Sequence, residues 1–239
     1  MHPVTPAGAL IGRERELALL TGLLAEAARG RGRAALVEGE PGIGKSALVQ
    51  AVVAQAPESG CEVIWCAGDE LSQALSLQPF LDGLRVREPS ANARRTAILR
   101  LLRGEAATER TDVSALLTEQ LLALVTEQCT ARPAILVVDD LHWADQASVA
   151  LWGLLARSAP KLPLLLVGTM RPVPRRNDLL ALRRRSVGNV ARLELAGLTD
   201  TAVADLVAAL AHGKPDDDLL RLADWAGGNP LYLSSWSRR

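Results

Sequence analysis

The segment at residues 39–46 constrains the fold more than any other part of the chain. It reads Gly-Glu-Pro-Gly-Ile-Gly-Lys-Ser, which has the G-x-x-x-x-G-K-S spacing of a phosphate-binding loop. Its glycines let successive backbone N–H groups converge on an anion, and a helix that begins at the end of the loop adds its positive dipole. Lys45 would bring a charge to the outer phosphates, and the Ser46 hydroxyl could ligate Mg²⁺.

The residues around this phosphate loop have the context that the motif requires, which is a strand before it and a helix after it. Residues 33–38 form a short apolar run, and residues 46–56 place apolar side chains at helical spacing. Because both neighbours are present, a chance glycine-rich turn is the weaker interpretation.

Composition excludes several functional classes. The 239 residues are 49% hydrophobic, and the 27 basic and 27 acidic residues balance, which argues against a broad nucleic-acid-binding surface. Cys61, Cys66 and Cys129 lack metal-ligand spacing and are expected to be free thiols in a reducing compartment. The sequence has no apolar run of about 18 residues and no signal-peptide pattern, so we expect a cytoplasmic protein that does not interact with membranes.

Strands and helices alternate along the chain, which predicts an α/β fold with a parallel sheet. The expected strands are residues 33–38, 62–66, 134–138, 162–168 and 190–195. We expect a flexible N-terminus over residues 1–9, because this segment contains proline and glycine and lies at the end of the chain.

A pair of carboxylates directly follows the apolar run at 134–138. A Mg-nucleotide site needs an acid at the end of a neighbouring strand. Asp139 could hold a Mg²⁺-bound water, and Asp140 could orient or deprotonate an attacking water. The alternative is two solvated acids that cap the next turn. A whole strand, 62–66, separates the phosphate loop from this pair in the sequence, which by analogy is typical of additional-strand ATPases.

Arg171 follows the strand at 162–168, so it should emerge at the same edge of the sheet as Lys45. An arginine there could sense the γ-phosphate, with Thr169 as a polar helper; the alternative is a solvated loop arginine. His142 and Trp143 have no neighbouring nucleophile, and we interpret them as packing or coupling residues.

Five segments together resemble a known family: LIGRERELALL, GEPGIGKS, VVDDLHWAD, GTMRP and GGNPLYL. In this order they resemble the AAA-like ATPase domain of signal-transduction ATPases with numerous domains (STAND), most of all the version in large LuxR-type transcriptional regulators. The resemblance implies a P-loop NTPase of the additional-strand type, with a five-stranded sheet in the order 5-1-4-3-2. It also implies that Leu10, Ile11, Gly12 and Arg13 line an adenine pocket.

The resemblance further implies a core over residues 10–198 and a small, truncated helical lid over residues 199–239. Gly228, Asn229 and Pro230 would belong to this lid, with Pro230 against the base. The candidate catalytic residues are therefore Lys45, Asp140 and Arg171, and the candidate Mg²⁺ residues are Ser46 and Asp139. The candidate nucleotide-binding residues are Leu10, Ile11, Gly12, Arg13, Gly39, Glu40, Pro41, Gly42, Ile43, Gly44, Lys45, Ser46, Ala47, Arg171 and Pro230.

Three functions remain open from the sequence. The first is a regulatory switch that binds ATP or ADP with Mg²⁺, hydrolyses ATP slowly and self-associates when ATP is bound. Asp140 favours this interpretation, because vigorous additional-strand ATPases often have Glu there. The second is a working AAA-type ATPase or loader acting on a protein or DNA partner. It would need an arginine finger, for which Arg175, Arg176 and residues 183–185 are candidates. The third is a nucleotide-binding module that barely hydrolyses.

Relatives of the STAND type continue into winged-helix, repeat-type sensor and helix-turn-helix segments. This chain stops after GGNPLYL, and no recognition helix is identifiable. Three interpretations stay open: a fragment of a larger regulator, a truncated gene product or a minimal stand-alone domain. In each case we expect DNA to be contacted only through domains absent from this chain.

Overall fold

The computed structural model describes residues 10–71, 73–88, 90–105, 112–173, 176–185, 190–211, 213, 215, 223 and 225–236. Three expectations lie outside these residues. They are the flexible N-terminus at residues 1–9, the candidate arginine finger Arg175, and a helix that three acidic residues at 216–218 predict, because acids are favoured at a helix N-terminus.

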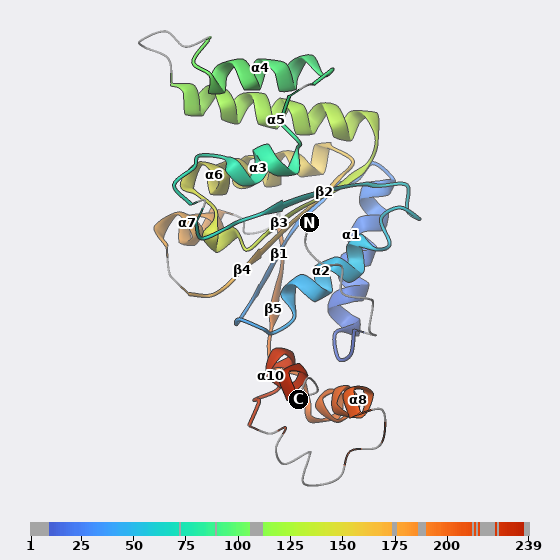
Figure 1. Ribbon diagram of the computed structural model, residues 1–239. Helices are drawn as coiled ribbons and strands as arrows, with labels where there is room; N and C mark the ends of the chain where they lie inside the picture. The colour runs from blue at the N-terminus through green and yellow to red at the C-terminus, as the bar shows by residue number, and fades with distance from the viewer. Residues whose placement is uncertain are drawn as a thin grey trace.

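A five-stranded parallel sheet forms the centre of the molecule (Figure 1). From one edge to the other it contains β2 (Glu62–Ala67), β3 (Ala134–Asp139), β4 (Leu164–Met170), β1 (Arg33–Gly39) and β5 (Val190–Leu195). This order is the predicted 5-1-4-3-2 read from the opposite edge, and all neighbouring pairs are parallel. The α/β fold predicted from the sequence is thus confirmed.

Helices cover both faces of the sheet, as strands buried on both faces require. On one face lie α1 (Glu14–Ala28) and α2 (Lys45–Val53). On the other face lie α3 (Gln78–Gly83), α5 (Val113–Ala131), α6 (Gln146–Ser158) and α7 (Asn177–Arg185), and α4 (Ala93–Leu102) packs on the outside of α5 (Figure 1).

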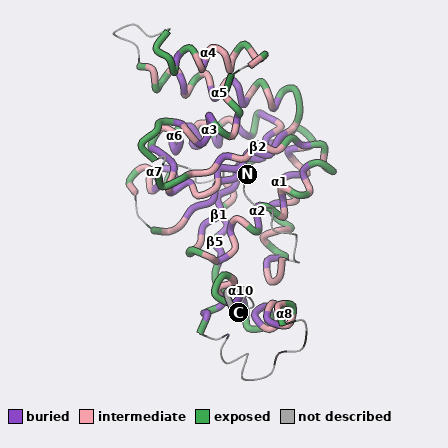
Figure 2. Tube along the Cα trace, viewed as in Figure 1, coloured by how far each residue is buried: buried purple, intermediate pink, exposed green. Residues whose placement is uncertain are grey.

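Alternate residues of the central strands divide between two hydrophobic cores, as the two-residue period of a strand dictates. In β3, Leu136 and Val138 join the core with α5 and α6, whereas Ile135 and Val137 join the core with α1 and α2. Figure 2 shows this buried layer running through the sheet. Cys61, Cys66 and Cys129 are buried and none forms a disulfide; burial raises the pKa of the Cys129 thiol to about 12.

Most element boundaries agree with the pattern of the sequence, with two corrections. The strand expected at residues 162–168 is displaced to Leu164–Met170, because Thr169 remains in the strand with its hydroxyl paired. The helix expected at residues 46–56 ends at Val53, where the backbone tightens into Val52–Gln55 and Val53–Ala56 hydrogen bonds that span three residues.

Two arginines of α4, and Arg103 directly after it, are engaged within the chain. Arg94 pairs with Glu127, the Arg95 Nε atom donates to the Leu84 carbonyl, and Arg103 pairs with Glu88. These contacts attach α4 to its neighbours.

Beyond the carboxyl end of β5, two further helices form a separate small cluster (Figure 1). They are α8 (Asp200–Ala211) and α10 (Pro230–Trp236), and they share a core of Leu198, Val203, Val207 and Leu233. Ile11, from the start of the described chain, packs against the same core. In the part of the chain that the structure describes, no helix has the length and apolarity needed to cross a membrane.

Candidate functional site

The carboxyl ends of β3, β4 and β1 lie side by side, because these three strands are neighbours in the sheet. β3 ends at Asp139, Thr169 is the second-to-last residue of β4, and the phosphate loop follows β1. β4 therefore separates the loop from the acid pair in space, and β2 lies beyond them at the edge. This edge is where open α/β sheets place their ligands.

The phosphate loop leads directly into α2. Gly44 is the residue before the helix and has φ +101°, a value that favours glycine. The Lys45 side chain is buried, and its Nζ atom donates to the carbonyls of Gly39 at 2.8 Å and Glu40 at 2.9 Å. The ammonium group is thus held against the backbone at the start of the phosphate loop.

The electrostatics of Lys45 fit an anionic ligand. Burial lowers the pKa of the Lys45 ammonium, and the carboxylates of Asp140 and Asp139 oppose that shift. A phosphate group would supply further negative charge to a cation that has been taken out of water.

A three-residue cluster joins the loop to the acid pair. The Ser46 Oγ atom lies 3.2 Å from the Asp139 Oδ1 atom, and the Thr169 hydroxyl donates to the same oxygen at 2.5 Å. A serine hydroxyl and a carboxylate are oxygen donors of the kind that Mg²⁺ prefers. These residues could therefore hold a Mg²⁺ ion at the position that the sequence predicts.

Asp140 is fixed by its backbone. It has φ +51° and ψ +49°, and its N–H group donates to the Thr169 hydroxyl at 2.9 Å. The left-handed region is unfavourable for most residues but is tolerated by Asp and Asn. The side chain is 36% exposed, so its carboxylate can reach solvent at the edge of the sheet.

Arg171 lies on the same edge, as predicted. Its guanidinium carbon is 5.9 Å from the centre of the Trp143 ring, and its buried Nε atom has no hydrogen-bond partner among the described residues. Its charge contributes to lowering the pKa of Lys45. An unpaired arginine donor beside a buried lysine fits an anion at this edge.

His142 is fully buried beside this site. Its Nδ1 atom lies 3.7 Å from the Asp140 Oδ1 atom, and its ring centre is 5.0 Å from that of Trp143. Burial, with a contribution from the positive charge of Arg171, lowers the pKa of the imidazole to about 4. The imidazole is therefore neutral at physiological pH.

This pKa leads to a testable prediction for the nucleotide-free protein. The unfolded chain binds the His142 proton near pH 6.5, whereas the folded protein binds it near pH 4. The stabilisation by neutral His142 is therefore complete above about pH 6.5 and is lost as the pH falls toward 4. Between pH 7 and 4, we expect wild type to lose up to about 3 kcal/mol of unfolding free energy relative to His142→Gln, measured by thermal or urea unfolding. Parallel curves for the two proteins would contradict the prediction.

The proposed adenine-pocket residues bridge the core and the C-terminal helices. Leu10 packs against the core with α1 and α2, whereas Ile11 packs against α8. Gly12 has φ +72°, and a Cβ atom there would lie 2.5 Å from the Ala202 Cβ atom. Arg13 is buried, and its Nη2 atom donates to the carbonyls of Ile43 and Ala196 at 3.2 and 2.5 Å.

The start of α10 contacts the phosphate loop directly. The Asn229 side chain donates to the Pro41 carbonyl at 2.9 Å, and the Leu231 N–H group donates to the Gly42 carbonyl at 3.3 Å. A Cβ atom at Gly42 would lie 2.6 Å from the Leu231 Cβ atom. Pro230 lies between these two contacts, so the structure brings the candidate lid residues to the loop.

Other loop residues have different surroundings. The Ile43 side chain packs into the core with α1 and α2, whereas Glu40, Pro41 and Ala47 are exposed. For Glu40, the described contact with Lys45 is made by the backbone carbonyl. Asn229 lies in the GGNPLYL segment, but no pattern in that segment indicates the hydrogen bond of its side chain to the Pro41 carbonyl.

The candidate arginine fingers differ in their contacts. Arg176 is turned into the molecule, where it pairs with Asp178, and Arg183 pairs with the buried carboxylate of Glu38 at 2.6 Å. Arg184 is exposed. The contacts of Arg176 and Arg183 would have to break before either residue could reach a neighbouring molecule.

A family comparison agrees with this geometry. The family model described as the AAA ATPase domain matches residues 9–167. The chain belongs to the AAA ATPase domain family. Membership of this family implies that the domain binds a nucleotide, usually with Mg²⁺.

A curated relative of unknown function matches much of the chain. This uncharacterized protein of Rhizobium meliloti (strain 1021) is 26% identical over 193 residues, which are 69% of this chain and 19% of that protein. The chain thus spans about a fifth of the length of this curated relative.

Solved structures share the fold at low sequence identity. The Orc1 protein of Aeropyrum pernix, solved in complex with DNA, matches 96% of this chain and 60% of its own at a TM-score of 0.61 and 20% identity. Cdc6p of Pyrobaculum aerophilum matches 97% and 62% at a TM-score of 0.59 and 17% identity. A STAND protein with a tetratricopeptide repeat sensor from Pyrococcus horikoshii matches 96% and 30% at a TM-score of 0.51 and 19% identity.

Proposed function

We propose that this AAA ATPase domain is a regulatory nucleotide switch that binds ATP or ADP and hydrolyses ATP slowly. The main supporting observation is the contact between the phosphate loop and the C-terminal helices, made by Asn229 with Pro41 and by Leu231 with Gly42. Because these hydrogen bonds use carbonyls of the loop itself, a change of loop geometry on nucleotide binding would act on α10. The C-terminal helices would then be a lid whose position depends on the nucleotide.

The candidate catalytic and Mg²⁺ residues have distinct roles in this proposal. Lys45 and the loop amides would bind the phosphates, and Arg171 would contact the γ-phosphate with its unpaired donor. Ser46 and, through water, Asp139 would hold Mg²⁺, which neutralises phosphate charge when bound. Asp140 would orient the attacking water or accept its proton.

The side chain of Asp140 supports slow rather than fast turnover. An aspartate is one methylene shorter than the glutamate that rapid ATPases of this type often have. Asp140 is also held in a left-handed conformation by its N–H bond to Thr169. The backbone of Asp140 is therefore fixed at the edge of the sheet, and the shorter side chain reaches less far from it.

The proposed role in a larger signalling protein rests on sequence motifs rather than on the geometry of the nucleotide site. Segments such as VVDDLHWAD and GGNPLYL support membership of the STAND class, in the version found in LuxR-type transcriptional regulators. A STAND structure shares the fold. In this proposal the domain acts in the cytoplasm and self-associates when ATP is bound, and any DNA contact is made by other domains.

Single-turnover hydrolysis tests the proposed function. With enzyme in excess over Mg-ATP, we expect a rate below about 1 s⁻¹, the lower end of ordinary turnover. Mass spectrometry of the purified protein should find retained ADP near one equivalent. Size-exclusion chromatography should give a larger species with ATP than with ADP. A rate above about 1 s⁻¹, or identical assembly in both nucleotides, would refute the switch.

A further inference from the structure

The segment at residues 141–145 connects β3 to α6 and directly follows Asp140. It begins with a 3-10 turn, Leu141–Trp143. Two backbone hydrogen bonds close this turn, from Trp143 N–H to the Asp140 carbonyl at 2.8 Å and from Ala144 N–H to the Leu141 carbonyl at 3.2 Å. The orientation of Asp140 therefore depends on what holds this connection in place.

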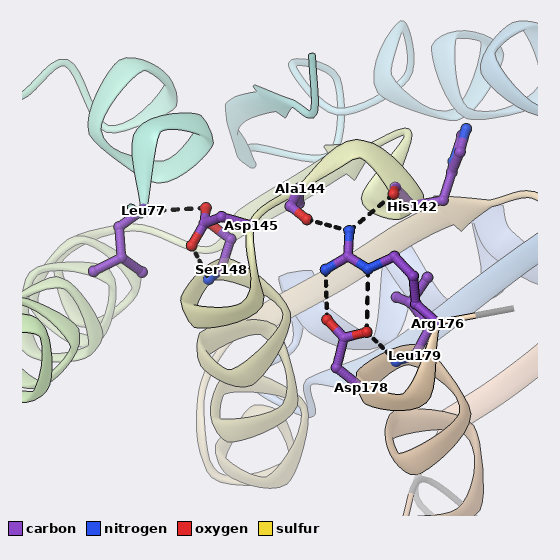
Figure 3. Close-up of polar contacts among 8 residues, drawn as sticks. All are labelled: Leu77, His142, Ala144, Asp145, Ser148, Arg176, Asp178 and Leu179. Atoms are coloured by element: carbon purple, nitrogen blue, oxygen red, sulfur yellow. Dashed lines mark hydrogen bonds and ion pairs between the residues drawn. The ribbon is translucent and has the colours of Figure 1, made fainter. Parts of the chain in front are cut away.

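Arg176 holds the connection from one side (Figure 3). It comes from the loop between β4 and α7, and its Nη1 atom donates to the carbonyls of Ala144 at 2.6 Å and His142 at 3.0 Å. These carbonyls belong to the turn that follows Asp140. A single guanidinium nitrogen thus ties two points of the turn to the neighbouring connection.

Asp178 fixes the guanidinium in turn. Its Oδ1 atom accepts from Arg176 Nε at 3.2 Å, and its Oδ2 atom accepts from Arg176 Nη2 at 2.5 Å. Asp178 also accepts the N–H group of Leu179 at 3.0 Å in the first turn of α7. The paired contact uses the planar fork of arginine, which lysine cannot reproduce.

Asp145 holds the same connection from the other side (Figure 3). Its Oδ1 atom accepts from the Ser148 N–H group at 3.0 Å, which caps α6. Its Oδ2 atom accepts from the Leu77 N–H group at 3.0 Å and from the Ser148 hydroxyl at 2.5 Å. Leu77 is buried and has φ +62°, so the chain before α3 adopts an unfavourable conformation where this bond forms.

We propose that Arg176 is a positioning residue for Asp140. By fixing the carbonyls of His142 and Ala144, it keeps the turn closed and Asp140 in the conformation that presents its carboxylate at the edge of the sheet. Arg176 acts through the backbone and does not contact the nucleotide. This inference rests on the proposed function, in which Asp140 orients the attacking water.

The test compares three substitutions with a control. Arg176→Met keeps the apolar stem and removes all donors, Arg176→Lys keeps the charge without the fork, and Asp178→Asn weakens the pair. The control is Arg157→Met, which removes an exposed arginine from α6. Single-turnover hydrolysis, Mg-ATP affinity and thermal unfolding are measured for each protein.

We expect Arg176→Met to slow hydrolysis by about 10- to 100-fold, which reaches only the lower end of the roughly 100- to 10,000-fold that general acid–base catalysis contributes, with a less than threefold change in Mg-ATP affinity. Arg176→Lys and Asp178→Asn should fall between this variant and wild type, and Arg157→Met should match wild type. Rate and affinity lost in parallel, or an unchanged rate, would overturn the inference. If Arg176→Met fails to fold, the same comparison is decided by the Lys and Asn variants.

A double-mutant cycle separates this inference from the proposed function. In the Asp140→Asn background, Arg176→Met should cause little further loss of rate, because both changes act through one residue. If Asp140→Asn slows hydrolysis and Arg176→Met slows it again by the full factor, the positioning role is wrong while the proposed function stands. If Asp140→Asn leaves the wild-type rate unchanged, Asp140 does not orient the water and the inference fails, while the switch is still decided by its own hydrolysis rate and assembly. If wild type does not hydrolyse ATP, the proposed function fails and the inference fails with it.

Discussion

Replacing Lys45 with alanine is expected to weaken Mg-ADP and Mg-ATP binding by about 100-fold or more. The ammonium is buried at the start of α2, and its described hydrogen bonds go to the carbonyls of Gly39 and Glu40. A hydrogen bond to a charged group contributes about 1.5–3 kcal/mol, and each 1.4 kcal/mol is a factor of ten in affinity. Alanine removes the charge and the donors together.

Calorimetric titration checks this expectation, with Lys161→Ala as the matched control. Lys161 is exposed in the 3-10 turn Ala159–Lys161 before β4, at the opposite end of the sheet from the phosphate loop. Thermal unfolding gives a second measure. Nucleotide at 100 times the wild-type Kd stabilises wild type by about 2.7 kcal/mol, and a 100-fold weaker variant should lose most of that gain. Unchanged affinity in Lys45→Ala would remove the phosphate loop from the proposed site.

The arrangement of the sheet could be predicted because its strands are buried on both faces. Continuous apolar runs such as residues 134–138 are typical of strands in a parallel sheet that helices cover on both faces. The phosphate-loop motif identifies residues 33–38 as the strand that leads into the loop. The order of the strands in the sheet came from the family resemblance. The start of helix α5 was predictable from a different signal, because aspartate is a strong N-cap residue. In the structure Asp112 accepts the Ala115 N–H group, as an N-cap does.

The end of β4 shows where a pattern of polarity misleads. Thr169 is polar, so the sequence predicts that the strand stops at Gly168. In the structure Thr169 is fully buried within β4, because its hydroxyl donates to Asp139 and accepts the Asp140 N–H group. A side chain whose hydrogen bonds are made by a neighbouring strand does not end its own strand. Asp139 and Thr169 are 30 residues apart in the sequence, so no local residue pattern indicates that their side chains form a hydrogen bond.

The contacts of Arg176 were hidden for the same reason. Several arginines follow β4, and nothing in their spacing separates the one that holds the turn from those that face solvent. Asp145 is similar, because an acid before a helix predicts an N-cap but does not predict its bond to Leu77. Local pattern thus identifies the residues that would bind the nucleotide, whereas tertiary structure identifies those that hold them.

Asp140→Asn is expected to slow single-turnover hydrolysis by about 100-fold, within the range that a positioned general base contributes. The substitution changes charge with little change of shape. Asn tolerates the left-handed backbone that Asp140 adopts at φ +51°. The N–H bond to Thr169 is also retained, because the backbone donates it.

Nucleotide affinity should remain equal or increase in this variant, because one negative charge near the phosphates is removed. The negative charge of Asp140 acts on Lys45, whose pKa it helps to raise against burial, and it would repel a phosphate in the same place. Single-turnover rates and calorimetric titrations of wild type, Asp140→Asn and Asp205→Asn, an exposed aspartate of α8, separate the two effects. A slower rate with retained affinity assigns the water-orienting role to Asp140. An unchanged rate excludes Asp140 from that role, and a loss of both would mean that its charge is needed for binding rather than for the reaction.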